Sequence, residues 1–319
     1  MKKVIILLLI ILSLSACGDR NSQRKINLAV IGKANTPYWD SAKLGAEAAA
    51  RDLGISVKFL VPEKEDPAWQ IRKIEELIAE PLDGMAFAAS DAKSIAPSVL
   101  KAMQDKIPCV ALDTDVGKSR HIYIGTRNYY LGKQAGDRMV SLLEDKGQIA
   151  VVADLSDNPD SLERVRGFRD TLAEHTNIEI AWQLEKEAVQ SADVESRLKT
   201  SSDLNGIFCA SDSAGVAAGE SVRNIGKVGQ IKIVCTGESS NAMKLVRDNV
   251  IQAMVARKPY RTGYISVLVL YNMARVGVDN ALLILPSSEI IDTGIFMVTP
   301  TSIAPYREYL KSLRIKVDF

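Results

Sequence analysis

Charged, aromatic and hydroxyl side chains recur in this sequence directly after short apolar runs. Carboxylates, cations and hydroxyls can exchange hydrogen bonds with the hydroxyl groups of a small molecule, and aromatic faces can cover its C–H surfaces. This combination suits the binding of a sugar or another polyol. The candidate ligand-binding residues are Lys33, Tyr38, Trp39, Asp91, Asp113, Asp115, Asp160, Arg164, Ser211, Asp212, Glu238 and Arg257.

Catalysis is less well supported by the same residues. Paired carboxylates can hydrolyse glycosides, so a carbohydrate-processing enzyme is a remote alternative. The sequence has no GxGxxG, GxSxG or HExxH motif, and the run GKS at 117–119 is no phosphate-binding loop because Leu112 stands where that motif needs Gly. Neither His121 nor His175 has another plausible metal ligand near it in sequence. We therefore expect no catalytic residue, no metal and no cofactor.

The candidate residues sit at strand ends of a predicted α/β fold. From Ile26 onward, apolar runs such as INLAVIG and ISVKFLV alternate with helical patterns, which is typical of a parallel sheet with helices on both faces. In such sheets ligands bind at the carboxyl ends of the strands. The loops expected to line a site are 32–39, 89–93, 113–116, 153–160, 210–214 and 236–240.

The strand and helix pattern occurs twice along the chain. Three landmarks of the first half return in the second half with the same spacing, which predicts two lobes of the same topology. The matching pairs, each 122 residues apart, are Pro37 with Pro159, Gly45 with Gly167, and Asp83-Gly84 with Asn205-Gly206.

The segments after the second half predict several passages between the lobes. They are VIQAMVA, a helix over 260–275, and EIIDTGIFMVT with a short polar tail. Their number suits a chain that returns to the first lobe and finishes in the second. Parallel crossovers of this kind form a hinge.

The first 25 residues carry an export signal. Lys2 and Lys3 precede an apolar stretch over 4–12 and then small residues, a pattern typical of a secretory signal peptide and too short for a mature membrane span. The run LSAC at 14–17 resembles a bacterial lipobox. We expect cleavage after residue 16, a lipid on Cys17 and a polar tether after it, with an ordinary signal peptide as the alternative.

The composition fits a globular protein with two domains. The chain has 319 residues, with 40 Lys+Arg against 39 Asp+Glu, and this balance argues against nucleic-acid binding. Cys109, Cys209 and Cys235 lie in apolar runs. We expect three buried thiols, and one disulfide among them is the alternative that an exported compartment permits.

Nine motifs, in their order along the chain, point to a known family. Together they resemble the sugar-binding proteins of the type I periplasmic-binding superfamily, in its ribose- and autoinducer-2-binding branch. The motifs are KANTPYW, GAEAAARDLG, DGMAFAASD, IPCVALDTD, YIGTRNYYLGKQAG, ERVRGF, NGIFCASD, RKPYRTGY and IDTGIFMVT. The resemblance implies two Rossmann-like lobes with parallel-core sheets and a multi-strand hinge. It also implies a monomer that captures a sugar or related polyol and delivers it to an ABC permease, or alternatively to a membrane sensor.

This resemblance fixes the expected division of the chain. The first lobe returns after the second has formed, so each lobe consists of two segments. We expect a signal peptide over 1–16, a lipidated tether over 17–25, a first lobe over 26–126 plus 258–287, and a second lobe over 127–257 plus 288–319.

Candidate residues of the first lobe have structural alternatives. The family places two aromatics against the sugar ring where this chain has Tyr38 and Trp39, but either ring could pack in the core. Lys33 could be a solvated surface residue. Asp113 and Asp115 stand two residues apart directly after a strand, and only one of them is expected to touch ligand.

Candidates of the second lobe have alternatives as well. Asp160 could cap a helix, and Arg164, which resembles a sugar-contacting residue of relatives, could form a surface ion pair instead. Relatives usually carry Asn-Asp where this chain has Ser211-Asp212, which leaves the hydroxyl contact there open.

At two further positions this chain differs from the family pattern in a way that bears on the charge of the ligand. Relatives often carry GFD where this chain has CTG at 235–237, so that Glu238 is left as a substitute for the missing carboxylate. Arg257 stands where they often have Gln or Asn. The loss of an acid and the gain of a cation predict a ligand more negative than a neutral sugar, such as an acidic or phosphorylated sugar.

Overall fold

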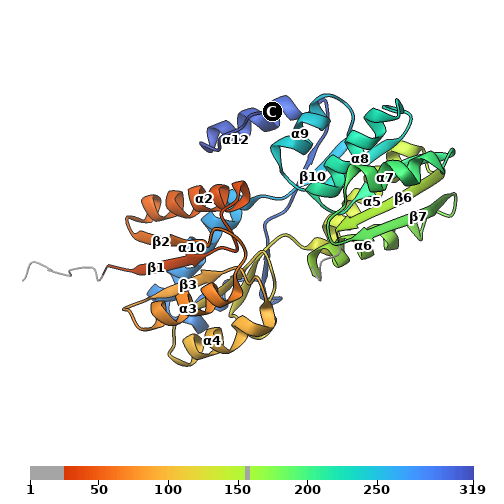
Figure 1. Cartoon of the computed structure of the whole chain (residues 1–319). Helices are drawn as coiled ribbons and strands as arrows, with labels where there is room; N and C mark the ends of the chain where they lie inside the picture. Colours follow the sequence, from red (N-terminus) through yellow and green to blue (C-terminus); the bar gives the residue numbers. More distant parts are fainter. Residues whose placement is uncertain (1–24, 155–158) are drawn as a thin grey trace, which may run out of the picture.

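The computed structural model describes residues 25–154 and 159–319, which form two α/β lobes (Figure 1). The expected signal peptide and the expected lipidation site at Cys17 lie outside the described residues. Each lobe is a six-stranded sheet with helices on both faces, as predicted. Among the helices of these two ranges, none combines the length and the apolar character needed to cross a bilayer.

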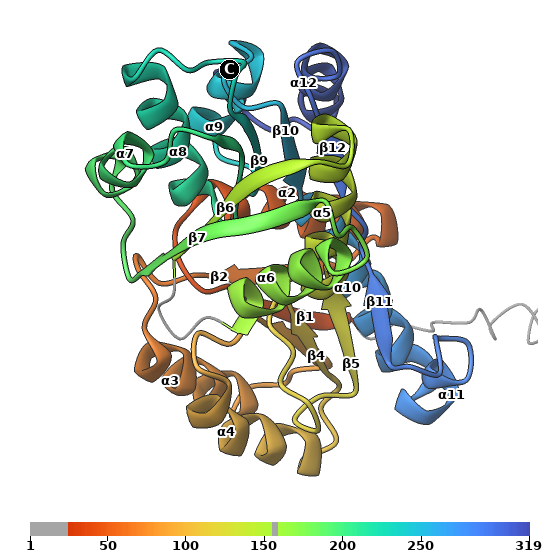
Figure 2. The same cartoon turned by 90° about the vertical axis from the view of Figure 1, so that its right-hand side faces the viewer.

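The first lobe is built on a fully parallel sheet in the order β11-β5-β4-β3-β1-β2. Its strands are β1 (Asn27–Ile31), β2 (Ser56–Leu60), β3 (Gly84–Phe87), β4 (Cys109–Leu112), β5 (Ile122–Gly125) and β11 (Ile290–Asp292). The helices are α2 (Pro37–Leu53), α10 (Pro259–Val276) and α11 (Val278–Leu282) on one face, and α3 (Pro67–Ile78) and α4 (Ala92–Gln104) on the other. Figure 2 shows α3 and α4 below this sheet and α2 above it.

The second lobe repeats this plan in the order β12-β10-β9-β8-β6-β7, with only the edge strand β12 antiparallel. Its strands are β6 (Gly147–Asp154), β7 (Ile178–Lys186), β8 (Leu204–Cys209), β9 (Lys232–Thr236), β10 (Ala253–Ala256) and β12 (Phe296–Val298). The helices are α5 (Asn128–Leu143) and α6 (Pro159–Leu172) on one face, and α7 (Ser191–Lys199), α8 (Asp212–Asn224), α9 (Ser240–Arg247) and α12 (Ile303–Ser312) on the other.

The predicted duplication is confirmed in atomic detail by two glycines 122 residues apart. A Cβ on Gly45 of α2 would lie 1.9 Å from the carbonyl oxygen of Tyr260 in α10. A Cβ on Gly167 of α6 would lie 1.9 Å from the carbonyl oxygen of Tyr129 in α5. In each lobe, therefore, the helix after the first strand packs against its neighbour at a place where only glycine fits.

The chain passes between the lobes three times, after β5, after β10 and after β11. The predicted end of the first lobe at residue 287 is too early, because β11 pairs with β5 and completes the first sheet. The prediction of a polar tail is also wrong. Ile303, Tyr306 and Leu310 recur at helical spacing, and they pack α12 onto the second lobe.

The three cysteines of the described residues are free and buried. This confirms the prediction of buried thiols, and the alternative of a disulfide among them is wrong.

Candidate ligand site

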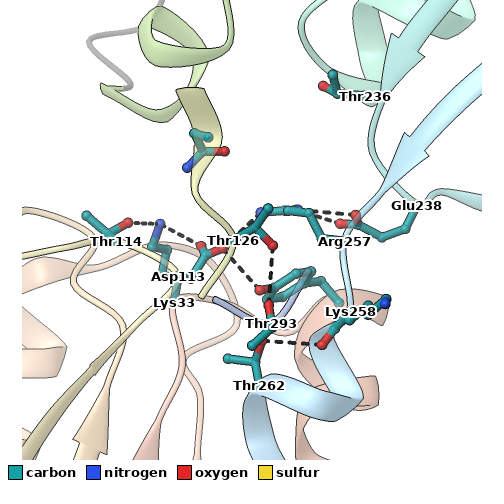
Figure 3. A network of polar contacts seen from close by, with 12 residues as sticks. Lys33, Asp113, Thr114, Thr126, Thr236, Glu238, Arg257, Lys258, Thr262 and Thr293 are labelled. Atoms are coloured by element: carbon teal, nitrogen blue, oxygen red, sulfur yellow. Dashed lines mark hydrogen bonds and ion pairs between the residues drawn. The ribbon is translucent and has the colours of Figure 1, made fainter. Parts of the chain in front are cut away.

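Charged side chains from both lobes meet where the carboxyl ends of the two sheets face each other (Figure 3). Lys33 and Asp113 come from the first lobe, Glu238 from the second, and Arg257 from the crossover between β10 and α10. We call Lys33, Asp113, Glu238 and Arg257 the interlobe cluster. All four are among the residues that the sequence predicts to bind ligand, and the structure brings them together.

Asp113 is the centre of the cluster. It follows β4 with a left-handed backbone (φ 59°), and the Tyr123 hydroxyl donates to its carbonyl oxygen at 2.8 Å. Its Oδ1 accepts hydrogen bonds from the Tyr38 hydroxyl at 3.1 Å and from Arg257 Nη1 at 2.9 Å, while Oδ2 lies 3.1 Å from Lys33 Nζ. Burial would raise the pKa of Asp113, but Lys33 and Arg257 outweigh it and hold that pKa well below its usual range.

Lys33 is not a solvated surface residue. Its Nζ also donates to Thr114 Oγ1 at 2.6 Å, and only 14% of its side chain is exposed. Burial disfavours the ammonium, but the charges of Asp113 and Asp160 prevail and raise the pKa of Lys33. Burial and the charge of Asp113 in turn raise the pKa of Asp160, so this second-lobe carboxylate lies within electrostatic reach of the first lobe.

Arg257 bridges the lobes. Its Nη2 and Nε donate to the two carboxylate oxygens of Glu238 at 2.5 and 3.2 Å, its Nη1 reaches Asp113, and its guanidinium lies 4.3 Å from the centre of the Tyr38 ring. Burial opposes its charge, yet Glu238 and Asp113 raise its pKa well above the usual value. Glu238 thus supplies a carboxylate beside Arg257 where position 237 lacks one, which offsets the loss of an acid on which the prediction of an anionic ligand rests.

Arg164 lies inside the second lobe. Its Nε donates to Asn128 Oδ1 at 2.8 Å, and its Nη1 donates to the carbonyl oxygen of Ala210 at 3.1 Å. Burial and the nearby Arg257 lower its pKa. The surface ion pair proposed as its alternative is formed instead by Arg166 and Glu163, 2.6 Å apart. Arg164 thus ties the end of β8 to the start of α5.

Three predicted residues of the first lobe lie outside the interlobe cluster. Trp39 is buried in the core against Gly32, which leaves Tyr38 as the ring at the site. Asp91 is exposed, and its carboxylate caps α4 by accepting from the N–H groups at 93 and 94. Asp115 accepts from Arg120 Nε at 2.6 Å and Nη2 at 2.9 Å, so its partners differ from those of Asp113. An extended strand end would place residues two apart on the same face, and the left-handed backbone of Asp113 breaks that pattern.

The pair Ser211-Asp212 shapes the second lobe locally. Ser211 caps α8 and donates to Asp154 Oδ2 at 2.5 Å. Asp212 accepts from the backbone N–H groups of Glu238 at 3.1 Å and Ser239 at 2.8 Å. Asp212 therefore fixes the loop that carries Glu238.

Several residues that complete the site were missed in the sequence. Thr114 binds Lys33, Tyr123 holds the backbone of Asp113, and Asn128 receives Arg164. Thr114 stands between the candidate residues Asp113 and Asp115, and this position could have identified it from the sequence. Tyr123 and Asn128 act through contacts that only the folded chain brings about.

A groove of about 990 Å³ runs beside the interlobe cluster. Its walls are α2 of the first lobe and α12 with the C-terminal segment of the second. Tyr38, Asp212, Glu238 and Arg257 lie on its lining. The volume is at the upper end of the range for small-molecule sites, so the lobes leave ample room for a small molecule.

Known proteins share this architecture. The D-allose-binding periplasmic protein of Escherichia coli (strain K12) is 24% identical over 247 residues, which are 73% of this chain and 79% of that protein. The ribose import binding protein RbsB of Salmonella typhimurium is 25% identical over 79% of this chain and 86% of its own. The crystal structure of a sugar ABC transporter's sugar-binding protein from Bacillus halodurans is similar with a TM-score of 0.80 and 27% identity, covering 89% of this chain and 100% of that one. Residues 26–277 match the family described as periplasmic binding protein domain, and the chain belongs to this family.

Proposed function

We propose that this protein is an extracytoplasmic solute-binding lipoprotein that captures a sugar or related polyol between its lobes and delivers it to an ABC importer. The observation that carries the proposal is the interlobe cluster, in which a buried, ionised carboxylate stands among donors at the facing strand ends. A carboxylate accepts hydrogen bonds from pairs of hydroxyls, and the lysine can donate to others. The sugar-binding relatives add support from outside the chain.

Each lobe has its share of the contacts in this proposal. Lys33, Tyr38 and Asp113 serve the ligand from the first lobe, with the Tyr38 ring against its C–H surface. Asp160 and Glu238 serve it from the second lobe, and Arg257 joins the lobes at the crossover. A ligand that touches both sides stabilises the closed arrangement of the lobes, and a membrane partner can distinguish closed from open.

The test is calorimetric titration of the purified protein with pentoses, hexoses, sugar acids and autoinducer-2. We expect one compound to bind at micromolar or tighter affinity and to reduce the radius of gyration in small-angle scattering, because closure makes the molecule more compact. Binding without compaction would contradict the mechanism, and turnover of a glycoside would replace the proposal with an enzyme.

The lipid anchor is tested separately. The proposal of an anchor rests on the predicted export signal and on Cys17, which follows it. Metabolic labelling with radioactive palmitate should mark the wild-type protein and not the Cys17→Ala variant. Equal labelling of both would contradict anchoring at Cys17.

A further inference from the structure

The Arg257 side chain covers two groups of the site that a sugar would need to contact. Its guanidinium lies 4.3 Å from the centre of the Tyr38 ring and 2.9 Å from Asp113 Oδ1. In the proposed function, the Tyr38 ring and the Asp113 carboxylate are the aromatic face and the main acceptor of the site. One side chain therefore covers both.

The contacts on the other side of Arg257 hold it in this place. Glu238 receives two of its N–H groups, at 2.5 and 3.2 Å, and the loop of Glu238 is in turn fixed by Asp212. The side chains of Arg257 and Glu238 are only 17% and 15% exposed. Figure 3 shows the two hydrogen bonds between Arg257 and Glu238. Bidentate pairing of this kind is among the stronger hydrogen-bonded arrangements in proteins, so it holds the guanidinium in one orientation.

The position of Arg257 in the chain makes its contacts depend on both lobes. It stands between β10 of the second lobe and α10 of the first, and it joins Glu238 of the second lobe to Asp113 of the first. A ligand that enters between the lobes must either leave these contacts intact and lose the Tyr38 face, or displace the guanidinium from it.

We propose that Arg257 is a specificity-determining residue that acts as an internal competitor, so that a neutral monosaccharide binds only by displacing its guanidinium from Tyr38 and Asp113. The inference rests on the proposed function and goes beyond it, because it assigns to one side chain the control of affinity. It follows that removal of the competitor should increase the affinity for neutral monosaccharides.

The experiment uses a double variant, Arg257→Gln with Glu238→Gln. Arg257→Gln alone would leave the largely buried Glu238 carboxylate without its partner, and that uncompensated charge would obscure the result. The probes are D-ribose and D-allose, titrated calorimetrically into the purified full-length protein. We expect the double variant to bind at least one of them at least tenfold more tightly than the wild type does.

A matched control exchanges an ion pair elsewhere in the second lobe. Arg223 Nη2 and Asp248 Oδ2 lie 3.2 Å apart, with half-exposed side chains. Arg223→Gln with Asp248→Asn makes the same chemical change there and should leave both affinities within twofold of the wild type. Unchanged or weaker binding by the Arg257/Glu238 variant would overturn the inference and make Arg257 a direct sugar ligand.

A second measurement needs no ligand. Nitrogen-15 NMR of arginine-labelled wild-type protein should show one slowly exchanging Nε–H signal that is missing from the spectrum of Arg257→Gln. Its absence from the wild type would overturn the inference, because the guanidinium would then not be held. A wild type that binds no sugar contradicts the proposed function, whereas a gain in the double variant still supports the competitor.

Discussion

At the residue scale, the site depends on one carboxylate whose ionisation the surrounding cations secure. Asp113 is buried, and Lys33 and Arg257 lower its pKa below the ordinary value of about 3.9. A carboxyl group with a lowered folded-state pKa adds stability above its unfolded pKa, and this stability is lost as the pH falls from there through the folded value. Acid should therefore weaken the folded protein through Asp113.

The first prediction concerns Asp113→Asn, which removes this titration. The wild type should be more stable than the variant at about pH 6, and the difference in free energy of unfolding should shrink between about pH 4 and pH 3. Urea unfolding at these pH values measures it. A difference that stays constant over the range would show that Asp113 does not titrate as described.

The second prediction compares two arginines of α6. Arg164→Ala removes buried hydrogen bonds to Asn128 and Ala210 and should lower the free energy of unfolding by about 2–4 kcal/mol. Arg166→Ala breaks an exposed pair with Glu163 and an exposed contact with the Tyr129 ring, and should cost about 1 kcal/mol or less. Similar losses for the two variants in urea unfolding would contradict the structural role of Arg164.

The sequence identified loops whose side chains meet between the lobes, but it could not show which side chains of each loop would do so. The prediction that only one of Asp113 and Asp115 belongs to the site holds, but the cause is the left-handed backbone of Asp113, which the sequence does not reveal. The choice between Tyr38 and Trp39 depends on whether a ring packs against Gly32, and the partner of Arg257 depends on which loop lies opposite. Both are tertiary contacts without a local signal.

At the element scale, close packing of α2 on α10 and of α6 on α5 sets the frame of each lobe. The sequence shows Gly45 and Gly167 as a repeat, but only the structure shows why glycine is needed. A Cβ at either position would lie 1.9 Å from a carbonyl oxygen of the neighbouring helix. The same limit explains the errors in the prediction. A three-residue strand such as β11 carries little pattern, and the apolar positions of α12 are few.

The third prediction uses these glycines. Gly45→Ala and Gly167→Ala should each destabilise the protein by at least about 1–3 kcal/mol, because the helices must move apart to admit a methyl group. Lys43→Ala, on the exposed side of α2, should change the free energy of unfolding by less than about 0.5 kcal/mol. Thermal or urea unfolding decides the matter, and a neutral glycine variant would mean that the helix contact is looser than described.

At the scale of the whole molecule, two similar lobes and three crossovers make a hinge with the charged groups at its centre. The repeat and the alternation of elements allowed this architecture to be predicted, because both are written in local patterns. The charge balance was not predictable, since the pairing of Arg257 with Glu238 and Asp113 arises only when strand ends from both lobes come together.

The measurement that tests this account most directly is the thermal unfolding of the wild type and of Asp113→Asn in the presence of sugars. A ligand that binds only the native state raises the melting temperature. We predict that at least one neutral or acidic sugar raises the melting temperature of the wild type by several degrees and leaves that of the variant unchanged. Equal shifts for both proteins, or no shift of the wild type with any sugar, would contradict a sugar site at Asp113 between the lobes.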